Sequence, residues 1–548
     1  MSLAVFLGKG IKTSELESSL HLSQTPLYRG GEGTWKKSFI DAVSDCNGKL
    51  TWDPAAILSI LSFGYVCGDR TLLNEVKRRP WLSRITEDGE CFLETIPPHG
   101  RLWKPYDEIT DNFVRAICNE AIKACRGRKE IYLLLSGGLD SRVAGAALAK
   151  LVNEGRLATK PIAVTWGPSN CRDVVYGREV ARLLEFKWIH VDFGPEDVMY
   201  NIDEAVGVGS LVSPVHLHRM SWFRQVSRDA VVIASSYGDM VGRAEFSGRH
   251  LLELDYLHPV NAFGLVKYDI FGAAYQGVMK DLKQLRERAP NQPKYVLCEH
   301  QMHGNYTRGM LMQAMSLINQ HCTLYQMFTD PNVYSYMWSI HPALRFDDTY
   351  ANVLKKLAPR VAKIPWARTN RALQGRTSGA KSNLQEKFHS YESWIGAPLF
   401  DRLYHYVDPE WFGQTGIFEP EKIRNLAEEV RNGRDGKGPY GFWPYEEWLW
   451  LASLRRMAEH LDRLGKSVAL DSVAVDKPHN MPILVPWTKR YLTGRILGRS
   501  ALAYNLARRC SKPLRGILKK VRRSILKYQA VCKYPPEGRT KQNHHEHL

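Results

Sequence analysis

The 548-residue sequence lacks several patterns that define other classes of protein. Its ten cysteines include no CxxC pair, which argues against zinc ribbons and paired-cysteine redox motifs and favours buried thiols in a reducing compartment. No apolar run approaches the roughly 18 to 20 residues that span a bilayer, and the first residues carry no charged leader typical of a signal peptide. These absences predict a cytoplasmic protein.

The positive charge is concentrated at one end of the sequence. From Arg495 to Leu548 there are 14 Lys or Arg and two acidic residues, so +12 of the formal net charge of +18 lies there. Because the basicity belongs to this tail, no specific nucleic-acid partner is expected for the folded body. Within the tail, one helical stripe is apolar: Leu514, Ile517, Leu518, Val521, Ile525 and Tyr528.

The residues opposite that stripe are basic, which makes 513–531 a basic amphipathic helix. Such a helix suits peripheral contact with an anionic surface, such as the inner membrane surface, or with RNA. Packing of the stripe on the protein itself is an equally good interpretation, and both are left open.

Short apolar runs alternate with helical periodicity in the first half of the chain. Strands are expected at 131–135, 161–166 and 230–235, and in FKWIHVDF, with helices from Ser141 and across 174–184. Continuous apolar strands separated by helices are typical of a parallel sheet covered on both faces. The sequence therefore predicts an α/β fold with a doubly wound parallel sheet, followed by a largely helical C-terminal part.

Polar residues and glycines follow three of these strands. SGGLDS (136–141) follows the first, Thr165-Trp166-Gly167 ends the second, and SSYGD (235–239) ends the third. Ligands of open parallel sheets bind beyond the carboxyl ends of the strands. We therefore expect a ligand site where these three segments meet.

The SGGLDS segment suits an oxyanion. Gly137 and Gly138 let the backbone approach closely, successive N–H groups at a helix start form an anion nest, and Ser136 and Ser141 add hydroxyl donors. Asp140 would repel a phosphate unless it holds a divalent cation. The segment lacks the Gly-Lys-Ser/Thr of a P-loop, so γ-phosphate transfer is not favoured. The alternative, a Gly-Gly turn that merely joins strand and helix, is left open.

SGGLDS resembles the SGGxDS pyrophosphate loop of the ATP pyrophosphatases, and other segments narrow the resemblance to asparagine synthetase-like proteins. VTWGPSNCRDVVYGREVARLLEFKWIHVDF resembles the second and third strands of that family, and VVIASSYGDMVG resembles its "SGEGADELFGG". The resemblance covers about 50 to 370. It implies an ATP-pyrophosphatase type of α/β fold that converts a carboxylate and ATP into an acyl-adenylate and then into an amide.

The resemblance also implies a set of site residues. Asp140 and Asp239 would hold Mg²⁺ and act in catalysis, and Lys355 is the candidate for the late catalytic lysine. Arg308 is expected to face the substrate cleft. The residues expected to bind ATP are Leu135, Ser136, Gly137, Gly138, Leu139, Asp140, Ser141, Val164, Thr165, Gly167, Ser235, Tyr237 and Gly238. Two histidines three apart in EHQMHGNYTR (299–308) have a metal-like spacing but no third ligand, so a metal there is not favoured.

The sequence departs from the family near its start. Ser2 stands where the family has a cysteine nucleophile. We expect 1–110 to be a truncated relic of the glutaminase-like region, 111–390 the ATP pyrophosphatase domain, 391–494 a helical extension and 495–548 the basic tail. The nitrogen donor is then expected to be ammonia or an amine, with a separate glutaminase as an alternative source.

The second signature also departs from the family. Met240, Gly242 and Arg243 replace a glutamate, a phenylalanine and a glycine. Two functions are left open. The first is an ATP-dependent carboxylate-amine ligase acting on an asparagine-type, sugar-acid or natural-product carboxylate. The second is a degenerate, non-catalytic nucleotide-binding scaffold, which Met240 favours and the intact SGGLDS opposes.

Overall fold

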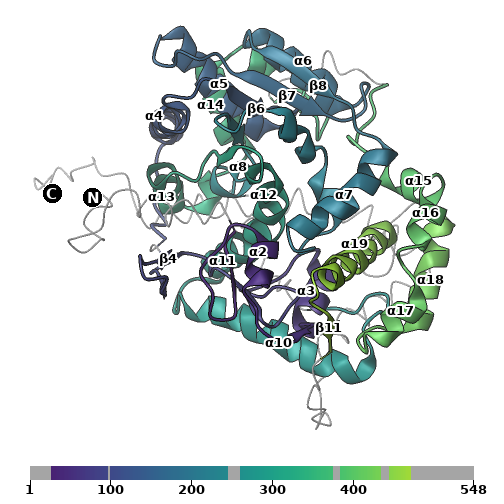
Figure 1. The fold of residues 1–548 in the computed structure, drawn as a ribbon. Coiled ribbons are helices and arrows are strands. Elements are labelled where there is room, and N and C mark those ends of the chain that lie inside the picture. The colour runs from purple at the N-terminus through teal and green to yellow at the C-terminus, as the bar shows by residue number, and fades with distance from the viewer. Residues whose placement is uncertain (1–25, 97–98, 245–258, 374–382, 433–442, 471–548) are drawn as a thin grey trace, which may run out of the picture.

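The computed structural model describes residues 26–96, 99–244, 259–373, 383–432 and 443–470 (Figure 1). Ser2 and the predicted tail helix at 513–531 lie outside these ranges. Within them, no helix is both long and apolar enough to cross a membrane.

A five-stranded parallel sheet confirms the predicted fold class. Its strands lie in the order β10-β9-β6-β7-β8. Their bounds are β6 (Ile131–Leu134), β7 (Ile162–Trp166), β8 (Lys187–Val191), β9 (Val231–Ala234) and β10 (Thr323–Gln326). The three inner strands β9, β6 and β7 are predominantly apolar, as expected for strands buried on both faces, whereas the edge strands β10 and β8 mix polar and apolar residues.

Helices cover both faces of the sheet, because successive side chains of each strand point to opposite sides. Ile131 and Leu133 pack in one core with α4, α5 and α14, whereas Tyr132 and Leu134 face a second core formed with α7 and α12. These helices are α4 (Tyr106–Cys125), α5 (Leu139–Asn153), α7 (Pro195–Gly207), α12 (Gln313–Asn319) and α14 (Asp347–Leu357). The sheet is therefore covered on both sides, as the sequence predicts.

The order of the strands reverses at β6. From β6 the chain runs through α5 to β7 and through α6 (Arg172–Leu183) to β8, and then returns to β9 on the other side of β6. Leu133 lies opposite Ala163 of β7 and Ile233 of β9, so the three strands end side by side. Such a reversal is where ligand crevices of open α/β sheets lie.

The remaining elements either pack around the sheet or form a second body, which lies below the sheet in the view of Figure 1. The short strands are β1 (Tyr28–Gly30), β2 (Leu50–Thr51), β3 (Val76–Arg78), β4 (Ser83–Ile85), β5 (Cys91–Leu93) and β11 (Val468–Ala469). The N-terminal and middle helices are α2 (Phe39–Ser44), α3 (Pro54–Phe63), α8 (Gly238–Val241), α10 (Tyr268–Glu287), α11 (Lys294–Gln301), the π-helical η4 (Met302–Met312) and α13 (Pro331–Ser339). The C-terminal helices are α15 (Tyr391–Gly396), α16 (Phe400–Tyr404), α17 (Pro409–Gln414), α18 (Pro420–Arg431) and α19 (Pro444–Arg463).

The N-terminal and C-terminal parts of the described chain share one hydrophobic core. Apolar side chains from 28–76 pack with those from 391–461, and β2 pairs with β11 in parallel. Figure 1 shows α3 beside α19 and β11. Segments 28–76 and 391–461, from the predicted units 1–110 and 391–494, therefore share one packed body, while the predicted boundaries themselves stay predictions.

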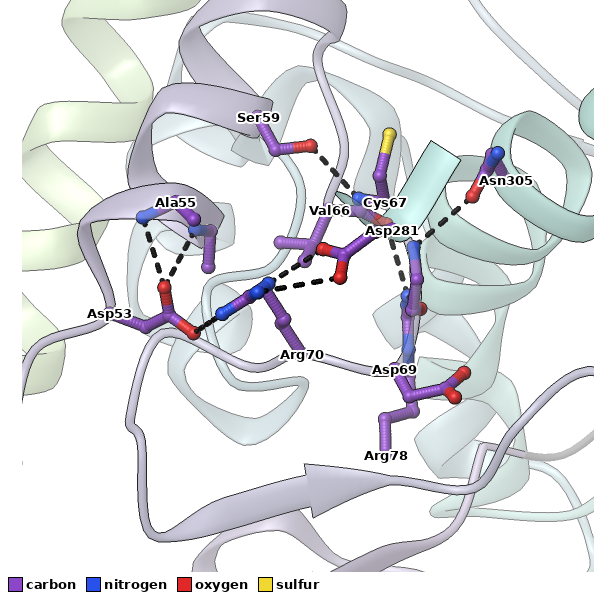
Figure 2. Close-up of polar contacts among 12 residues, drawn as sticks. Asp53, Ala55, Ser59, Val66, Cys67, Asp69, Arg70, Arg78, Asp281 and Asn305 are labelled. Carbon is purple, nitrogen blue, oxygen red and sulfur yellow. Dashed lines mark hydrogen bonds and ion pairs between the residues drawn. The ribbon is translucent and has the colours of Figure 1, made fainter. Parts of the chain in front are cut away.

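Within this body, two carboxylates bonded to Arg70 link the start of α3 to α10 (Figure 2). One oxygen of Asp53 caps α3 by accepting from the N–H groups of Ala55 and Ala56, at 2.9 and 3.1 Å. Its other oxygen accepts from Arg70 Nη1 at 2.8 Å, and Arg70 Nε donates to Asp281 Oδ2 of α10 at 2.6 Å. The paired carboxylates raise the pKa of Arg70 despite its burial, which keeps the bridge charged.

We expect Asp281→Ala to lower the free energy of unfolding by about 2 kcal/mol, because Arg70 loses a partner in a largely buried position. Glu410→Ala, which breaks the exposed pair with Arg424, is the matched control and should cost less than about 1 kcal/mol. Urea denaturation followed by circular dichroism measures both. Equal losses would mean that the Arg70 bridge does not anchor α10 to the N-terminal part.

Candidate functional site

A cavity of about 320 Å³ lies beyond the ends of β6, β7 and β9, where the strand order reverses. It is lined by eight of the residues that the sequence predicts to bind a ligand: Leu135, Ser136, Gly138, Asp140, Ser141, Val164, Thr165 and Ser235. A volume near 300 Å³ lies within the range of small-molecule sites. The structure therefore brings the three predicted segments together at one cavity.

The SGGLDS segment forms a tight turn that begins α5. The N–H of Ser136 donates to Ser141 Oγ at 3.1 Å, and the N–H of Gly138 donates to Ser136 Oγ at 3.0 Å. The N–H of Gly137 donates to Asp173 Oδ1 at 3.0 Å. With Gly138 as the cap of a 15-residue helix, the positive end of the helix dipole points at the cavity. This arrangement favours an anionic ligand beside the turn.

Gly137 itself has a steric role. A Cβ on Gly137 would lie 2.6 Å from Ala367 Cβ, so only glycine lets the segment 364–367 cross the turn. The buried guanidinium of Arg142 fixes that crossing by donating to the carbonyls of Gly137 and Ile364, each at 2.8 Å. The simple structural interpretation of the Gly-Gly pair thus holds for Gly137, whereas Gly138 lines the cavity.

Asp140 lies at the cavity wall in a charged pair. Arg243 donates through Nε to Asp140 Oδ1 at 3.1 Å and through Nη2 to Oδ2 at 3.2 Å, and its Nη1 donates to Asp347 Oδ1 at 2.9 Å. Burial raises the pKa of Asp140, and the adjacent Arg243 opposes that rise. Both carboxylate oxygens of Asp140 are therefore directed at a guanidinium.

The end of β9 lies directly against Asp140. A Cβ on Gly238 would be 2.7 Å from Asp140 Cβ, and the Gly238 carbonyl accepts from Tyr350 Oη at 2.8 Å. Asp239 follows in α8, and its charge contributes to raising the pKa of Arg243. The two predicted metal ligands thus come from adjacent strand ends.

The described side chains do not present a ready magnesium site at Asp140. Its two oxygens already accept from Arg243, and no cluster of three or more His, Cys, Asp or Glu among the described residues is placed to hold a metal ion. A cation bound to Asp140 would have to displace the guanidinium. The assignment of Mg²⁺ to Asp140 and Asp239 stays a prediction.

The third wall comes from β7. Thr165 Oγ1 donates to the Leu135 carbonyl at 2.6 Å, and this bond links the end of β7 to the end of β6. Gly167 has a φ of 131°, a conformation that favours glycine, and its carbonyl contacts His190 Nε2 at 2.7 Å. Of the other predicted ligand-binding residues, the side chain of Leu139 lies in the core and that of Tyr237 is almost fully buried.

Some residues at the cavity were not predicted from the sequence. Asp173 lines it, and burial raises the pKa of this carboxyl although the N–H of Gly137 donates to it. His218 stacks on Trp166 with ring centroids 6.0 Å apart, and Phe388 meets the His218 ring edge-on. An acid in the first turn of a helix gave a sequence signal for Asp173, whereas nothing local marked His218 or Phe388.

Two other predicted positions lie away from the cavity. Lys355 is exposed in the last turn of α14, about 12 Å along the helix axis from Asp347, which contacts Arg243. The prediction that Arg308 faces the cleft is wrong. Its guanidinium is buried against the N-terminal part and donates to the Gly68 carbonyl and to Asp69 Oδ1, at 3.0 and 2.9 Å.

The chain matches known proteins over this part of the fold. Residues 114–233 match the family model described as asparagine synthase. The asparagine synthetases [glutamine-hydrolyzing] of Rattus norvegicus and Pongo abelii are each 28% identical over 138 residues, which is 24% of this chain and 25% of each relative. The match thus spans a quarter of the length of these relatives. The family likeness of this chain therefore rests on residues 114–233, which are similar to the asparagine synthase family.

A solved structure of NMN synthetase from Francisella tularensis is also similar. It shares 14% identity, and the match covers 40% of this chain and 94% of that chain, with a TM-score of 0.19. A likeness at this level carries no argument about the site.

The two histidines with metal-like spacing lie in an aromatic cluster. His300 stacks on Trp338 with centroids 5.0 Å apart, and His303 meets the same ring edge-on at 5.8 Å. Both are at most 3% exposed, and burial lowers the pKa of His300 to about 3 and of His303 to about 4.

This burial predicts acid sensitivity. Between the ordinary histidine pKa of about 6.5 and the folded value of His303, the unfolded chain binds a proton that the folded chain does not. The free energy of unfolding should therefore fall as the pH drops through this range, by up to about 1.4 kcal/mol per pH unit for each such histidine. His303→Asn should reduce the slope, measured by urea denaturation from pH 7 to pH 4. His405→Asn, at an exposed position, should leave it unchanged.

Proposed function

We propose that the protein is an ATP-dependent ligase that activates a small carboxylate as its acyl-adenylate and transfers the acyl group to ammonia or an amine. The observation that carries this proposal is the cavity at the strand reversal, with the SGGLDS turn and the start of α5 on one side. The asparagine synthase match over 114–233 includes β6, α5, β7 and α6, each of which contributes residues to the wall of this cavity, and it ends within β9.

The chemistry divides into two balanced steps. A carboxylate oxygen of the acceptor attacks the α-phosphorus of ATP, and the bond to pyrophosphate breaks. The nitrogen of ammonia or an amine then attacks the acyl carbon, AMP leaves, and the nitrogen loses a proton. The protein would contribute charge stabilisation and orientation at the departing pyrophosphate rather than a covalent intermediate.

Each group at the cavity has a role in this proposal. The start of α5, with Ser136, Gly138 and Ser141, would hold the pyrophosphate, since N–H groups at a helix start favour anions. The wall at Val164 and Thr165 would hold the adenosine. A carboxylate acceptor would lie against the part of the wall where Met310, Leu311, Ala314 and Met315 form an apolar surface. That surface favours an acceptor with an apolar body.

A second function, a non-catalytic nucleotide-binding scaffold, is favoured by one observation. Arg243 occupies both oxygens of Asp140, which the resemblance assigns to Mg²⁺. Exchange of labelled pyrophosphate into ATP separates the two functions, because only an enzyme that forms an adenylate reversibly supports it.

We expect purified protein to support exchange and AMP release that depend on added carboxylate, in a screen of amino-acid, sugar-acid and aliphatic carboxylates. Aliphatic and other largely apolar carboxylates should give the highest rates, because of the Met310–Met315 wall. ATP binding without exchange for any carboxylate would favour the scaffold. Absence of both would contradict a nucleotide site at this cavity.

Ser235 offers a sharper test of the cavity. Within the described part of the chain, its buried Oγ has no hydrogen-bond partner although the residue lines the cavity. A buried hydroxyl without a partner is unfavourable for folding and suits a ligand that would supply one. Ser235→Ala should therefore weaken ATP binding about five- to tenfold, the loss of one hydrogen bond, without lowering stability.

Ser59→Ala is the matched control. Ser59 Oγ donates to the Tyr65 carbonyl at 3.0 Å and accepts from the Cys67 N–H at 2.9 Å, and Figure 2 shows the contact with Cys67. Ser59 is not among the residues that line the cavity. This variant should lose about 1–3 kcal/mol of stability and keep its ATP affinity. Isothermal titration calorimetry and thermal unfolding measure both properties. Unchanged ATP binding in Ser235→Ala would remove Ser235 from the site.

A further inference from the structure

Asp140 poses an electrostatic problem for an anionic ligand. Its carboxylate lies at the cavity wall, on the same turn as Ser136 and Gly138, and its side chain is 21% exposed. An unpaired carboxylate at this place would repel phosphate groups. Carboxylates beside phosphates in proteins are commonly bridged to them by a divalent cation. A protein without such a bridge needs another positive charge close to Asp140.

Arg243 supplies that charge from within the fold. Its side chain is only 4% exposed, and it meets Asp140 with two parallel hydrogen bonds at 3.1 and 3.2 Å. A guanidinium stays protonated in proteins, and the neighbouring carboxylates raise the pKa of Arg243 further. The charge of Asp140 is therefore permanently compensated by a residue that is not among those lining the cavity.

The position of Arg243 is built by its neighbours. The guanidinium lies near the rings of Tyr350 and Trp366, 5.8 and 5.6 Å from their centroids. A Cβ on Gly242 would lie 2.2 Å from Tyr350 Oη, so only glycine at 242 leaves room for that ring. Asp347 holds the third corner of the guanidinium through Nη1. Gly242 thus makes room for the Tyr350 ring, and the adjacent Arg243 places its guanidinium near the same ring.

We propose that Arg243 is a resident counter-cation for Asp140 that takes the place of a divalent cation at this carboxylate, so that the site binds its nucleotide largely without Mg²⁺. This inference rests on the proposed function for the nucleotide itself. Arg243 is a positioning residue in this arrangement, because it acts through Asp140 and is shielded from the cavity. The prediction that Asp140 binds Mg²⁺ is the competing explanation.

The first experiment uses the unmodified protein. ATP and inorganic pyrophosphate are titrated by calorimetry in buffer with excess EDTA and in buffer with Mg²⁺. We expect the two affinities for each ligand to agree within about tenfold, since the charge of Asp140 is already compensated. Binding that is detectable only with Mg²⁺ would overturn the counter-cation and leave the proposed function standing. No binding in either buffer would instead contradict the proposed function.

Variants separate charge compensation from a purely structural role. Arg243→Gln exposes the phosphates to an uncompensated Asp140, so its affinity in EDTA should fall by more than about tenfold and recover in part with Mg²⁺. The double variant Asp140→Asn with Arg243→Gln removes both charges and should regain binding in EDTA. Arg243→Lys keeps the charge and should behave more like the unmodified protein than Arg243→Gln does.

Arg402→Gln is the control for loss of a guanidinium, because Arg402 forms an exposed pair with Glu196. It should leave both affinities unchanged. Thermal unfolding of every variant shows whether the fold survives. Equal losses in the two buffers for Arg243→Gln, without rescue in the double variant, would mean that Arg243 is only structural. If Arg243→Gln does not fold, the double variant and the comparison of buffers on the unmodified protein still decide the matter.

Discussion

The rim of the cavity depends on one buried guanidinium, that of Arg142. It has no exposed surface and donates to the carbonyls of Gly137 and Ile364, which belong to segments more than 220 residues apart in sequence. Burial lowers the pKa of Arg142 to about 10, so the group stays charged at neutral pH without bonding directly to a carboxylate. A charged donor makes strong hydrogen bonds to carbonyls, and here these bonds fix the turn that begins α5.

The fixed turn also affects the position of Arg243 beside Asp140. Segment 364–367 crosses Gly137, and Trp366 within it lies near the guanidinium of Arg243. Arg142 therefore positions one of the rings around Arg243, which compensates Asp140. The two arginines have different roles, since one organises backbone and the other balances charge. Because these roles differ, neither arginine can replace the other, although neither lines the cavity.

Local patterns predicted the sheet and the cavity well. The apolar runs, the alternating helices and the polar strand ends depend on residues close in sequence, and three strands in register necessarily bring their ends together. The pairing of Arg243 with Asp140 was not predicted, because its members are 103 residues apart and no local pattern links them. The wrong placement of Arg308 has the same origin, because its partners, the Gly68 carbonyl and Asp69, are 240 and 239 residues away in sequence and no local pattern links them.

The shared core of 28–76 and 391–461 bears on how the chain folds as it leaves the ribosome. Strand β2 pairs with β11, about 418 residues later, and apolar residues of 391–461 complete the core, so part of the apolar surface of the N-terminal part stays uncovered until late in synthesis, although α7 and α10 pack on it earlier. The strands of the sheet lie between 131 and 326, so all five have been synthesised well before β11. Newly made chains therefore expose the N-terminal apolar surface longest, and this surface is where chaperones have the most to bind.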